Sequence, residues 1–329
     1  MRRRDFITLL GGAAAWPVAG RAQQPSGMRR IGVLTAYSES DPEAQARFGA
    51  FRERLQKLGW TEGRNIRIDT RWASADVEAM QRFARELVAL QPDLILSQST
   101  TTTAALLQQT RTIPIVFAIV ADPVGSGFVA SLARPGGNAT GFVVMEGSLG
   151  GKWLELLKEI APRVTRVALP FNPATATFAE YYLNPVKAAA ASLGVEAIVA
   201  PVHDRSELES VIAAQAREPN SGLVVIPDAF TINHRAEITL LAARHRLPAV
   251  YPYRDFTELG GLLSYGFDRL ENWRGVAGYV DRILKGEKPA DLPVQAPSKY
   301  ELVLNLKTAK ALDLDVPWIL QQRADEVIE

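Results

Sequence analysis

The chain has 329 residues, of which 47% are hydrophobic, with 37 basic and 36 acidic side chains and no cysteine. This length and apolar content suit one large or two modest globular domains. The near-neutral charge lacks a basic block and so argues against a nucleic-acid partner. The lack of cysteine excludes disulfides, thiolate metal ligands and a cysteine nucleophile.

The first 22 residues have the pattern of an export signal. Arginines at 2–4 precede a mildly apolar run over 6–20, shorter than the roughly 20 residues that span a bilayer. The order at 3–7, Arg-Arg-Asp-Phe-Ile, resembles the twin-arginine signal. We therefore expect a signal peptide over 1–22 with cleavage after Ala22 and a periplasmic location; an ordinary basic N-terminus is the alternative.

After the leader, short apolar runs alternate with amphipathic segments almost to the end of the chain. Strands are predicted at 30–36, 65–73, 93–97, 113–120, 139–145, 165–171, 195–202, 222–227, 248–252 and 260–266. Helices are predicted at 41–59, 76–91, 101–110, 125–133, 150–162, 175–193, 205–217 and 232–246. For the first helix, Asp41 is the expected N-cap, Pro42 the first helical residue and Gly59 the C-terminal stop.

This alternation predicts an α/β fold with parallel sheets covered by helices on both faces. About ten strands are too many for one open sheet in a chain of this size. We therefore expect two doubly wound, Rossmann-like lobes, with "RPGGNATGF" at 134–142 as a boundary. A closed eight-stranded (β/α) barrel is the alternative, and the surplus of strands argues against it.

Ligands of open α/β sheets bind beyond the carboxyl ends of the strands. The polar and aromatic residues that follow the predicted strands are therefore candidates for ligand binding: Tyr37, Ser38, Ser99, Thr100, Asp122, Asp228, Tyr251 and Tyr265.

The run "SQSTTTTAAL" is the most informative of these segments. It places the Ser99 and Thr100 hydroxyls and free N–H groups at a helix N-terminus, a seat for a carboxylate, although plain helix capping is the alternative. Asp122 and Asp228 could pair with an ammonium group across a cleft or could serve as turn residues. The tyrosines could stack on an aromatic ligand or simply pack.

One motif points to a different class of protein. "GSGFVA" at 125–130 matches G-x-G-x-x-A, the dinucleotide pattern, and suggests an exported nicotinamide-dependent oxidoreductase as an alternative. The motif follows an internal strand, however, and residues 134–137 cut its helix short.

Motifs for a metal site or a nucleophile are also missing. His203, His234 and His245 fit no metal motif, and "LLSYG" lacks the first glycine of G-x-S-x-G. We therefore expect no enzyme, no cofactor and no metal.

Five segments in order resemble the ABC-transporter substrate-binding proteins of the tryptophan/tyrosine-transport type. They are "DPVGSGFVASLARPGGNATGF", "LGGKWLELLKEIAP", "GGLLSYGFD", "YVDRILKGEKPADLPV" and "ELVLNLKTAKALDLDVP". The similarity extends from about Arg29 to Glu329. It implies the type I periplasmic-binding architecture, in which two lobes enclose a ligand cleft and are joined by three crossovers, here at 140–143, 264–267 and 297–300.

The resemblance also implies lobe boundaries, an N-terminal lobe of 28–142 with 266–297 and a C-terminal lobe of 143–265 with 298–329. By this resemblance, the ligand-contacting positions of the family correspond to Ser38, Ser99, Thr100, Asp122, Asp228 and Tyr265. Tyr37 and Tyr251 are further candidates because they lie at strand ends.

The implied function is that of a solute receptor. It would capture a small carboxylate-bearing ligand, an amino acid or a relative, and hand it to an ABC permease in the inner membrane. Short crossovers predict hinge closure of a monomer around the ligand. A binding protein that serves a membrane sensor instead of a permease is a further alternative.

Overall fold

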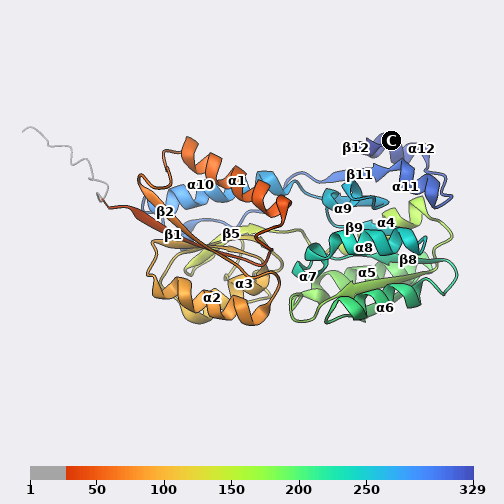
Figure 1. The fold of residues 1–329 in the computed structure, drawn as a ribbon, viewed down its shortest axis with the longest axis horizontal. Helices are drawn as coiled ribbons and strands as arrows, with labels where there is room; N and C mark the ends of the chain where they lie inside the picture. Colours follow the sequence, from red (N-terminus) through yellow and green to blue (C-terminus); the bar gives the residue numbers. More distant parts are fainter. Residues whose placement is uncertain (1–26) are drawn as a thin grey trace, which may run out of the picture.

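The computed structural model describes residues 27–329, so the predicted signal peptide over 1–22 lies outside the described residues. Two open sheets, each covered by helices, lie one beyond the other along the long axis of the molecule (Figure 1). The prediction of an α/β fold with two lobes is therefore confirmed, and the barrel alternative is wrong because neither sheet closes.

The N-terminal lobe is built on five parallel strands in the order β2-β1-β3-β4-β5. The strands are β1 Arg29–Thr35, β2 Ile66–Trp72, β3 Leu94–Gln98, β4 Ile115–Val120 and β5 Ala139–Val143. The helices are α1 Pro42–Lys57, α2 Val77–Ala89, α3 Thr100–Gln109 and α10 Arg269–Leu284. Helices α1 and α10 pack together on one face of the sheet, and α2 and α3 pack together on the other (Figure 1).

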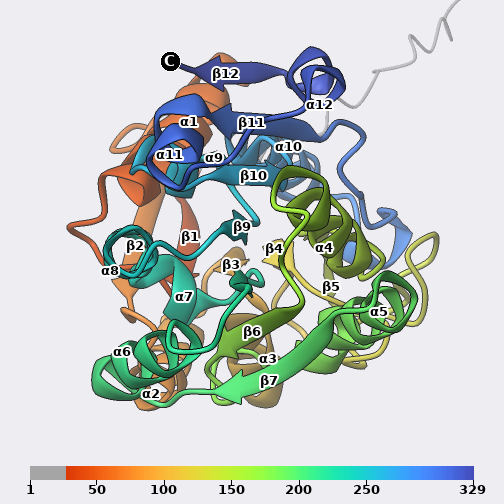
Figure 2. The ribbon, with the colours of Figure 1, turned by 90° about the vertical axis from the view of Figure 1, so that its right-hand side faces the viewer.

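The C-terminal lobe is built on seven strands in the order β12-β11-β10-β9-β8-β6-β7. Figure 2 looks onto this lobe, with β7 at one edge and β12 at the other. The strands are β6 Arg166–Phe171, β7 Glu196–Pro201, β8 Ser221–Val224, β9 Ala249–Tyr251, β10 Leu263–Gly266, β11 Glu301–Asn305 and β12 Glu326–Ile328. The helices are α4 Leu149–Ile160, α5 Ala179–Leu193, α6 Arg205–Gln215, α7 Ala229–Asn233, α8 Arg235–Arg244, α9 Arg254–Glu258, α11 Leu306–Ala311 and α12 Trp318–Arg323.

The chain passes between the two sheets three times. It leaves the first sheet after β5, returns between β10 and α10, and leaves again after the 3-10 turn Pro289–Asp291 and Gln295. The last passage is held to the first, because Gln295 N–H donates to Gly141 O at 2.9 Å. The first and last of the three connecting segments therefore lie side by side at the junction of the lobes.

The start of α1 shows why these residues form a helix where they do. The Asp41 carboxylate accepts from the N–H groups of Glu43 and Ala44, and Pro42 occupies the first turn, where it loses no hydrogen bond. Leu58 ends the helix and Gly59 follows with φ +96°, a conformation that glycine adopts without steric cost.

The structure departs from the predicted elements at 125–133 and in the C-terminal part of the chain. The expected helix at 125–133 is a series of turns, because the Asp122 carboxylate accepts from Gly125 N–H at 2.9 Å and starts a tight turn instead. The C-terminal segment, in turn, contains two strands that the alternation did not predict, β11 and β12. Strand β11 runs antiparallel to β10, so the second sheet is mixed rather than wholly parallel.

Within residues 27–329, no helix combines the length and apolar character needed to cross a membrane. In the same range no three acidic or histidine side chains gather as a metal site would require.

Candidate functional site

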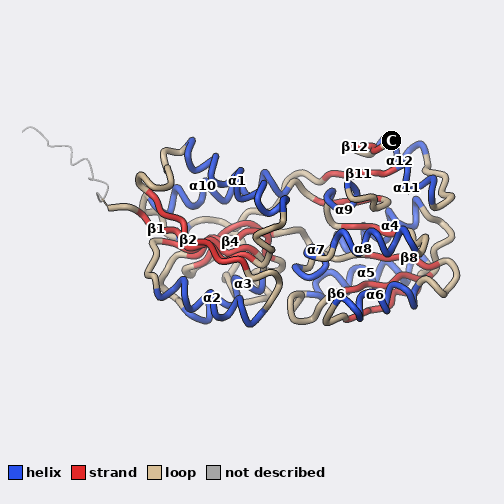
Figure 3. The backbone as a smooth tube through the Cα atoms, in the orientation of Figure 1, coloured by secondary structure: helices blue, strands red, loops and turns tan. Residues whose placement is uncertain are grey.

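Figure 3 shows that strands of both sheets end at the junction between the lobes. A small cavity lies at this junction. Its walls come from the ends of β3, β4 and β5 in one lobe and from the segments after β6, β8 and β9 in the other. The lining residues are Gln98, Ser99, Thr100, Ile119, Ala121, Val144, Thr175, Phe178, Pro227, Ala229, Ile232 and Tyr253. Its volume of about 20 Å³ has room for roughly one water molecule.

The N-terminus of α3 forms one wall of this cavity. Ser99 has φ +104° and caps the helix, because its hydroxyl accepts from Thr102 N–H at 3.2 Å. The Thr100 hydroxyl accepts from Ala121 N–H at 3.0 Å. In the described part of the chain, the N–H groups of Thr100 and Thr101 have no hydrogen-bond acceptor. They are therefore donors available at the positive end of a helix of ten residues.

A bulge in β4 turns a third side chain into the cavity. The pairing of β4 with β5 shifts register between Phe117 and Val120, and Ile119 has φ +57° within that shift. This left-handed conformation is strained for a β-branched residue. Bulges re-aim side chains next to binding sites, and Ile119 lines the cavity in this way.

Asp228 is the most deeply buried acid near the cavity, although its carboxylate is used inside its own lobe. Its side chain accepts from Thr175 Oγ1 at 2.5 Å, from Asn172 N–H at 2.9 Å and from Phe230 N–H at 3.2 Å. Burial raises the pKa of Asp228 to about 6, against the lowering effect of these bonds. The residue thus caps α7 and fixes the loop after β6.

Asp122 lies on the opposite lobe directly after Ala121, which lines the cavity. It is half-buried with φ +40°, and one carboxylate oxygen accepts from Gly125 N–H. Its other oxygen has no hydrogen-bond donor within the described residues. Asp122 is therefore the acid near the cavity that retains a free oxygen.

The predicted aromatic residues are dispersed. Tyr251 is buried in the core of its lobe, stacked on Phe256 with ring centroids 4.9 Å apart, and the structure does not bring it to the cavity. Tyr265 stacks on Tyr300 at 5.8 Å, near the junction but outside the cavity lining. Tyr37 is buried beneath Arg47, whose Cζ atom lies 5.0 Å from the ring centroid.

Ser38 also lies away from the cavity. It is half-buried in the turn before α1, where its hydroxyl bonds Ser40 Oγ at 2.9 Å. Of the eight predicted residues, the structure thus brings Ser99 and Thr100 to the cavity wall and places Asp122 and Asp228 beside it.

Sequence reasoning missed several of the lining residues. Tyr253 and Thr175 follow β9 and β6, so the rule of strand ends could have found them. Ile119 could not be found in this way, because an apolar residue inside a strand signals core and only the bulge exposes it.

Asn233 and Arg235, which closely follow the cavity-lining Ile232, both bond residues of the other lobe. Arg235 of α8 forms a two-pronged ion pair with Asp41 at the start of α1, with N–O distances of 2.7 and 2.8 Å. Asn233 Nδ2 donates to Ala36 O at 3.2 Å. Burial would raise the pKa of Asp41, but the hydrogen bond and charge of Arg235 outweigh it and hold that pKa below its ordinary value.

The dinucleotide motif at 125–130 lacks the helix that gives such motifs their function. These residues form turns, so no helix N-terminus follows Gly125 and Gly127 to receive a pyrophosphate. The oxidoreductase alternative loses its structural basis.

Comparisons with known proteins agree with this architecture. A curated tyrosine-binding protein from Clostridioides difficile is 26% identical over 267 residues, 80% of this chain and 75% of that protein. A crystal structure of a conserved domain protein from Vibrio cholerae superposes with a TM-score of 0.84 at 28% identity, covering 91% of this chain and 99% of that one. An ABC domain from Streptococcus pneumoniae, solved in complex with L-Trp, superposes with 0.82 at 24% identity, covering 92% and 100%.

A ligand-free, open substrate-binding protein from Clostridium difficile superposes with a TM-score of 0.64 at 24% identity, covering 92% of this chain and 99% of that one. The model of the family described as ABC transporter substrate binding protein matches residues 31–328, nearly all of the described chain. With two α/β lobes that enclose a cavity at their strand ends, the chain belongs to the ABC transporter substrate-binding proteins.

Proposed function

We propose that this protein is the receptor of an ABC importer and captures an amino acid or a related small carboxylate between its lobes. The observation that carries the proposal is the cavity at the strand ends, with the free N–H groups of Thr100 and Thr101 at its wall. Two relatives described as a tyrosine-binding protein and as a complex with L-Trp support this ligand class. Export through a signal peptide over 1–22 would deliver the receptor to the periplasm, where it meets its permease.

The ligand would lie with its carboxylate on the N-terminus of α3, at Ser99 and Thr100. Its ammonium group would face Asp122, which keeps a free oxygen, while Asp228 holds the facing loop in place. Phe178 and Tyr253 line the same cavity and would contact the rest of the ligand.

Binding would require the lobes to separate and close again. The cavity holds roughly one water molecule, far less than any amino acid needs. Two relatives of equal identity superpose unequally, with a TM-score of 0.82 for the L-Trp complex and 0.64 for the ligand-free, open protein. We propose that 28–142 with 266–297 moves as one lobe and 143–265 with 298–329 as the other, in a monomer.

The first test is direct. Native mass spectrometry of the purified protein identifies a co-purified solute, and calorimetric titration with tryptophan, tyrosine and phenylalanine measures affinity. Saturable binding of at least one amino acid is expected. Binding of a neutral sugar alone, such as myo-inositol, would overturn the ligand class.

Variants locate the ligand. Asp122→Asn and Thr100→Val should weaken binding about tenfold to a hundredfold, because a hydrogen bond to a charged group is worth about 1.5–3 kcal/mol. Thr112→Val, on the exposed surface of the same lobe, is the control. Unchanged affinity in both site variants would show that the ligand does not use these residues.

A further inference from the structure

Two arginines are buried side by side where the lobes meet. Arg47 lies on α1 and Arg269 is the first residue of α10, and their side chains are 2% and 4% exposed. Asp255 of α9, in the other lobe, is the carboxylate they share. Its Oδ2 bonds Arg269 Nη2 and lies 3.6 Å from Arg47 Nη1. Glu43 also lies 3.6 Å from Arg47 Nη1, but its side chain is 41% exposed.

This cluster contains an unusual number of donors without acceptors. Among the described residues, Arg47 Nε and Nη2, Arg269 Nη1 and the hydroxyls of Tyr37 and Tyr253 are all buried without a hydrogen-bond partner. Native proteins pair nearly all buried polar groups, so several unpaired donors in one place call for an acceptor. Every one of these groups can donate, and the guanidinium groups can only donate.

The charge of the cluster points the same way. Two buried guanidinium groups share one buried carboxylate, that of Asp255, and the other carboxylate near Arg47, that of Glu43, is largely screened by water because its side chain is exposed. Burial and the charge of Arg47 lower the pKa of Arg269 to about 10. An anion at the cluster would offset this repulsion.

The cluster adjoins the cavity between the lobes. The Arg269 Cζ atom lies 4.1 Å from the ring centroid of Tyr253, and Tyr253 lines the cavity together with Ser99 and Thr100. Tyr37 lies two residues after the end of β1, and the Arg47 guanidinium group packs over its ring. The unpaired donors therefore lie just behind one wall of the proposed ligand site.

We propose that Arg47, Arg269, Tyr37 and Tyr253 form a second subsite, which binds an anionic group the size of a carboxylate. The planar guanidinium fork matches the two oxygens of a carboxylate. Two sources share this chemistry: a second acidic group on the captured solute, which would make the solute a dicarboxylate or an acidic amino acid, and a free small anion. That an anion reaches this subsite through the cleft between the lobes rests on the proposed function. Whether an anion binds there can be measured independently of that function.

Thermal unfolding at constant ionic strength tests the subsite. The probes are sodium formate for a free anion and sodium succinate for a solute with two acidic groups, with sodium MES, a bulky sulfonate, as the salt control. We expect a saturable rise of Tm with at least one probe. Succinate acting at a tenfold or more lower concentration than formate assigns the subsite to the solute, and formate acting at equal or lower concentration assigns it to a free anion. No saturable rise with either probe would overturn the proposal.

Variants tie the effect to the cluster. Arg47→Met and Arg269→Met should abolish the rise, while Arg52→Met on α1 and Arg274→Met on α10, both more than 40% exposed, should keep it. An equal rise in the cluster variants would refute the proposal. If those variants do not fold, Tyr253→Phe decides, because it removes one hydroxyl and should raise the half-saturating concentration at least threefold.

The same samples separate the two proposals. Titration of wild type with amino acids reports the proposed function, and the formate and succinate series reports the subsite. Amino-acid binding without an anion effect would reject the subsite alone. A formate effect lost in Arg47→Met, without binding of any amino acid and without a stronger response to succinate, would reject the proposed ligand class alone.

Discussion

At the scale of single residues, Asp228 shows how a site candidate can serve the scaffold. It stands at a strand end, as a ligand-binding acid would, but its oxygens already receive Asn172 N–H, Thr175 Oγ1 and Phe230 N–H. A buried carboxylate with three donors holds two loops together and has little capacity left for a ligand. Asp122 has the same strand-end position and keeps one oxygen free.

Asp228→Asn should lower the free energy of unfolding, because its amide would direct a donor at groups that are themselves donors, at a cost of about 1–3 kcal/mol. The pKa of Asp228 is raised from 3.8 to about 6 on folding, so the folded state binds the extra proton between these values. Wild type therefore loses about 2–3 kcal/mol from this group as pH rises from 4 to above 6. The amide side chain of the variant does not titrate, so the variant lacks this loss. The difference in unfolding free energy between wild type and variant should therefore be larger at pH 4 than at pH 7.

Urea unfolding at both pH values measures this difference. Asp204→Asn is the control, since Asp204 caps α6 in the same manner but on the exposed surface. A deficit that is equal at the two pH values would contradict the raised pKa.

At the scale of elements, the pairing of β4 with β5 depends on a glycine. Gly141 has φ +151°, and a Cβ atom there would lie 2.0 Å from Phe117 O. Gly141 O also accepts from Gln295 N–H, which ties the last passage between the lobes to β5. One residue thus fixes both the edge of the first sheet and the attachment of a connecting segment.

Gly141→Ala should therefore destabilise the protein by about 1–3 kcal/mol or more, because backbone must move to admit the methyl group. Gly137→Ala, where a Cβ meets nothing within 4 Å, is the matched control. Denaturant unfolding of both variants is the measurement. Equal midpoints for the two would show that the strand pair adapts without cost.

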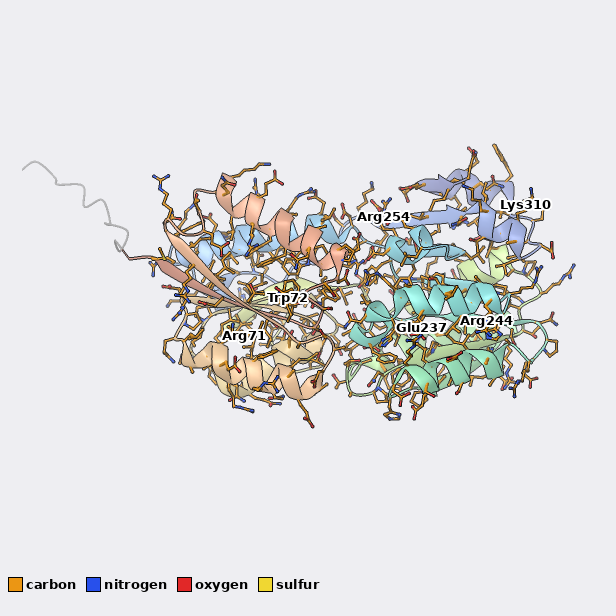
Figure 4. The ribbon with its side chains drawn as sticks, in the orientation of Figure 1. Arg71, Trp72, Glu237, Arg244, Arg254 and Lys310 are labelled. Atoms are coloured by element: carbon orange, nitrogen blue, oxygen red, sulfur yellow. The ribbon has the colours of Figure 1, made fainter. Side chains whose placement is uncertain are left out.

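A second connection at this scale holds the late strands in place. Arg254 at the start of α9, labelled in Figure 4, donates to Glu301 of β11 and Glu326 of β12 as well as to Glu258. The Arg254 side chain is 41% exposed, so each pair contributes little by itself. Together these bonds hold β11 and β12, which form one edge of the second sheet, against the start of α9.

At the scale of the whole molecule, the ion pair between Asp41 and Arg235 joins the lobes beside the cavity. Both side chains are nearly buried, at 6% and 12% exposure. Under the hinge closure proposed above, a contact made only when the lobes are together would favour the closed arrangement, and its loss would shift the population toward the open one. Ligand affinity should follow that population.

Arg235→Met should increase the radius of gyration without ligand and weaken ligand binding at least threefold, because the closed arrangement loses its ion pair and leaves Asp41 uncompensated. Small-angle scattering and calorimetry check the two effects. Arg244→Met, at the far end of the same helix in Figure 4, is the control and should change neither. A variant with unchanged scattering and affinity would show that this pair does not govern closure.

The amino-acid sequence by itself determined the class of fold and most of its elements. Periodicity placed α1 with its cap at Asp41, and continuous apolar runs placed the buried strands, because local capping and burial on both faces leave marks in the residues themselves. The strand-end rule also found Ser99 and Thr100, since the carboxyl ends of parallel strands lie at one edge whatever the details of packing.

Only the tertiary structure decided what these residues contact. The bulge at Ile119, the internal bonds of Asp228 and the antiparallel strand β11 depend on partners distant in sequence. Arg47 and Arg269 lie 222 positions apart in two helices with ordinary amphipathic patterns, and nothing local marks them as a pair. Their burial beside one another follows from the return of α10 to the first lobe, because long-range packing brings together charges that the sequence keeps apart.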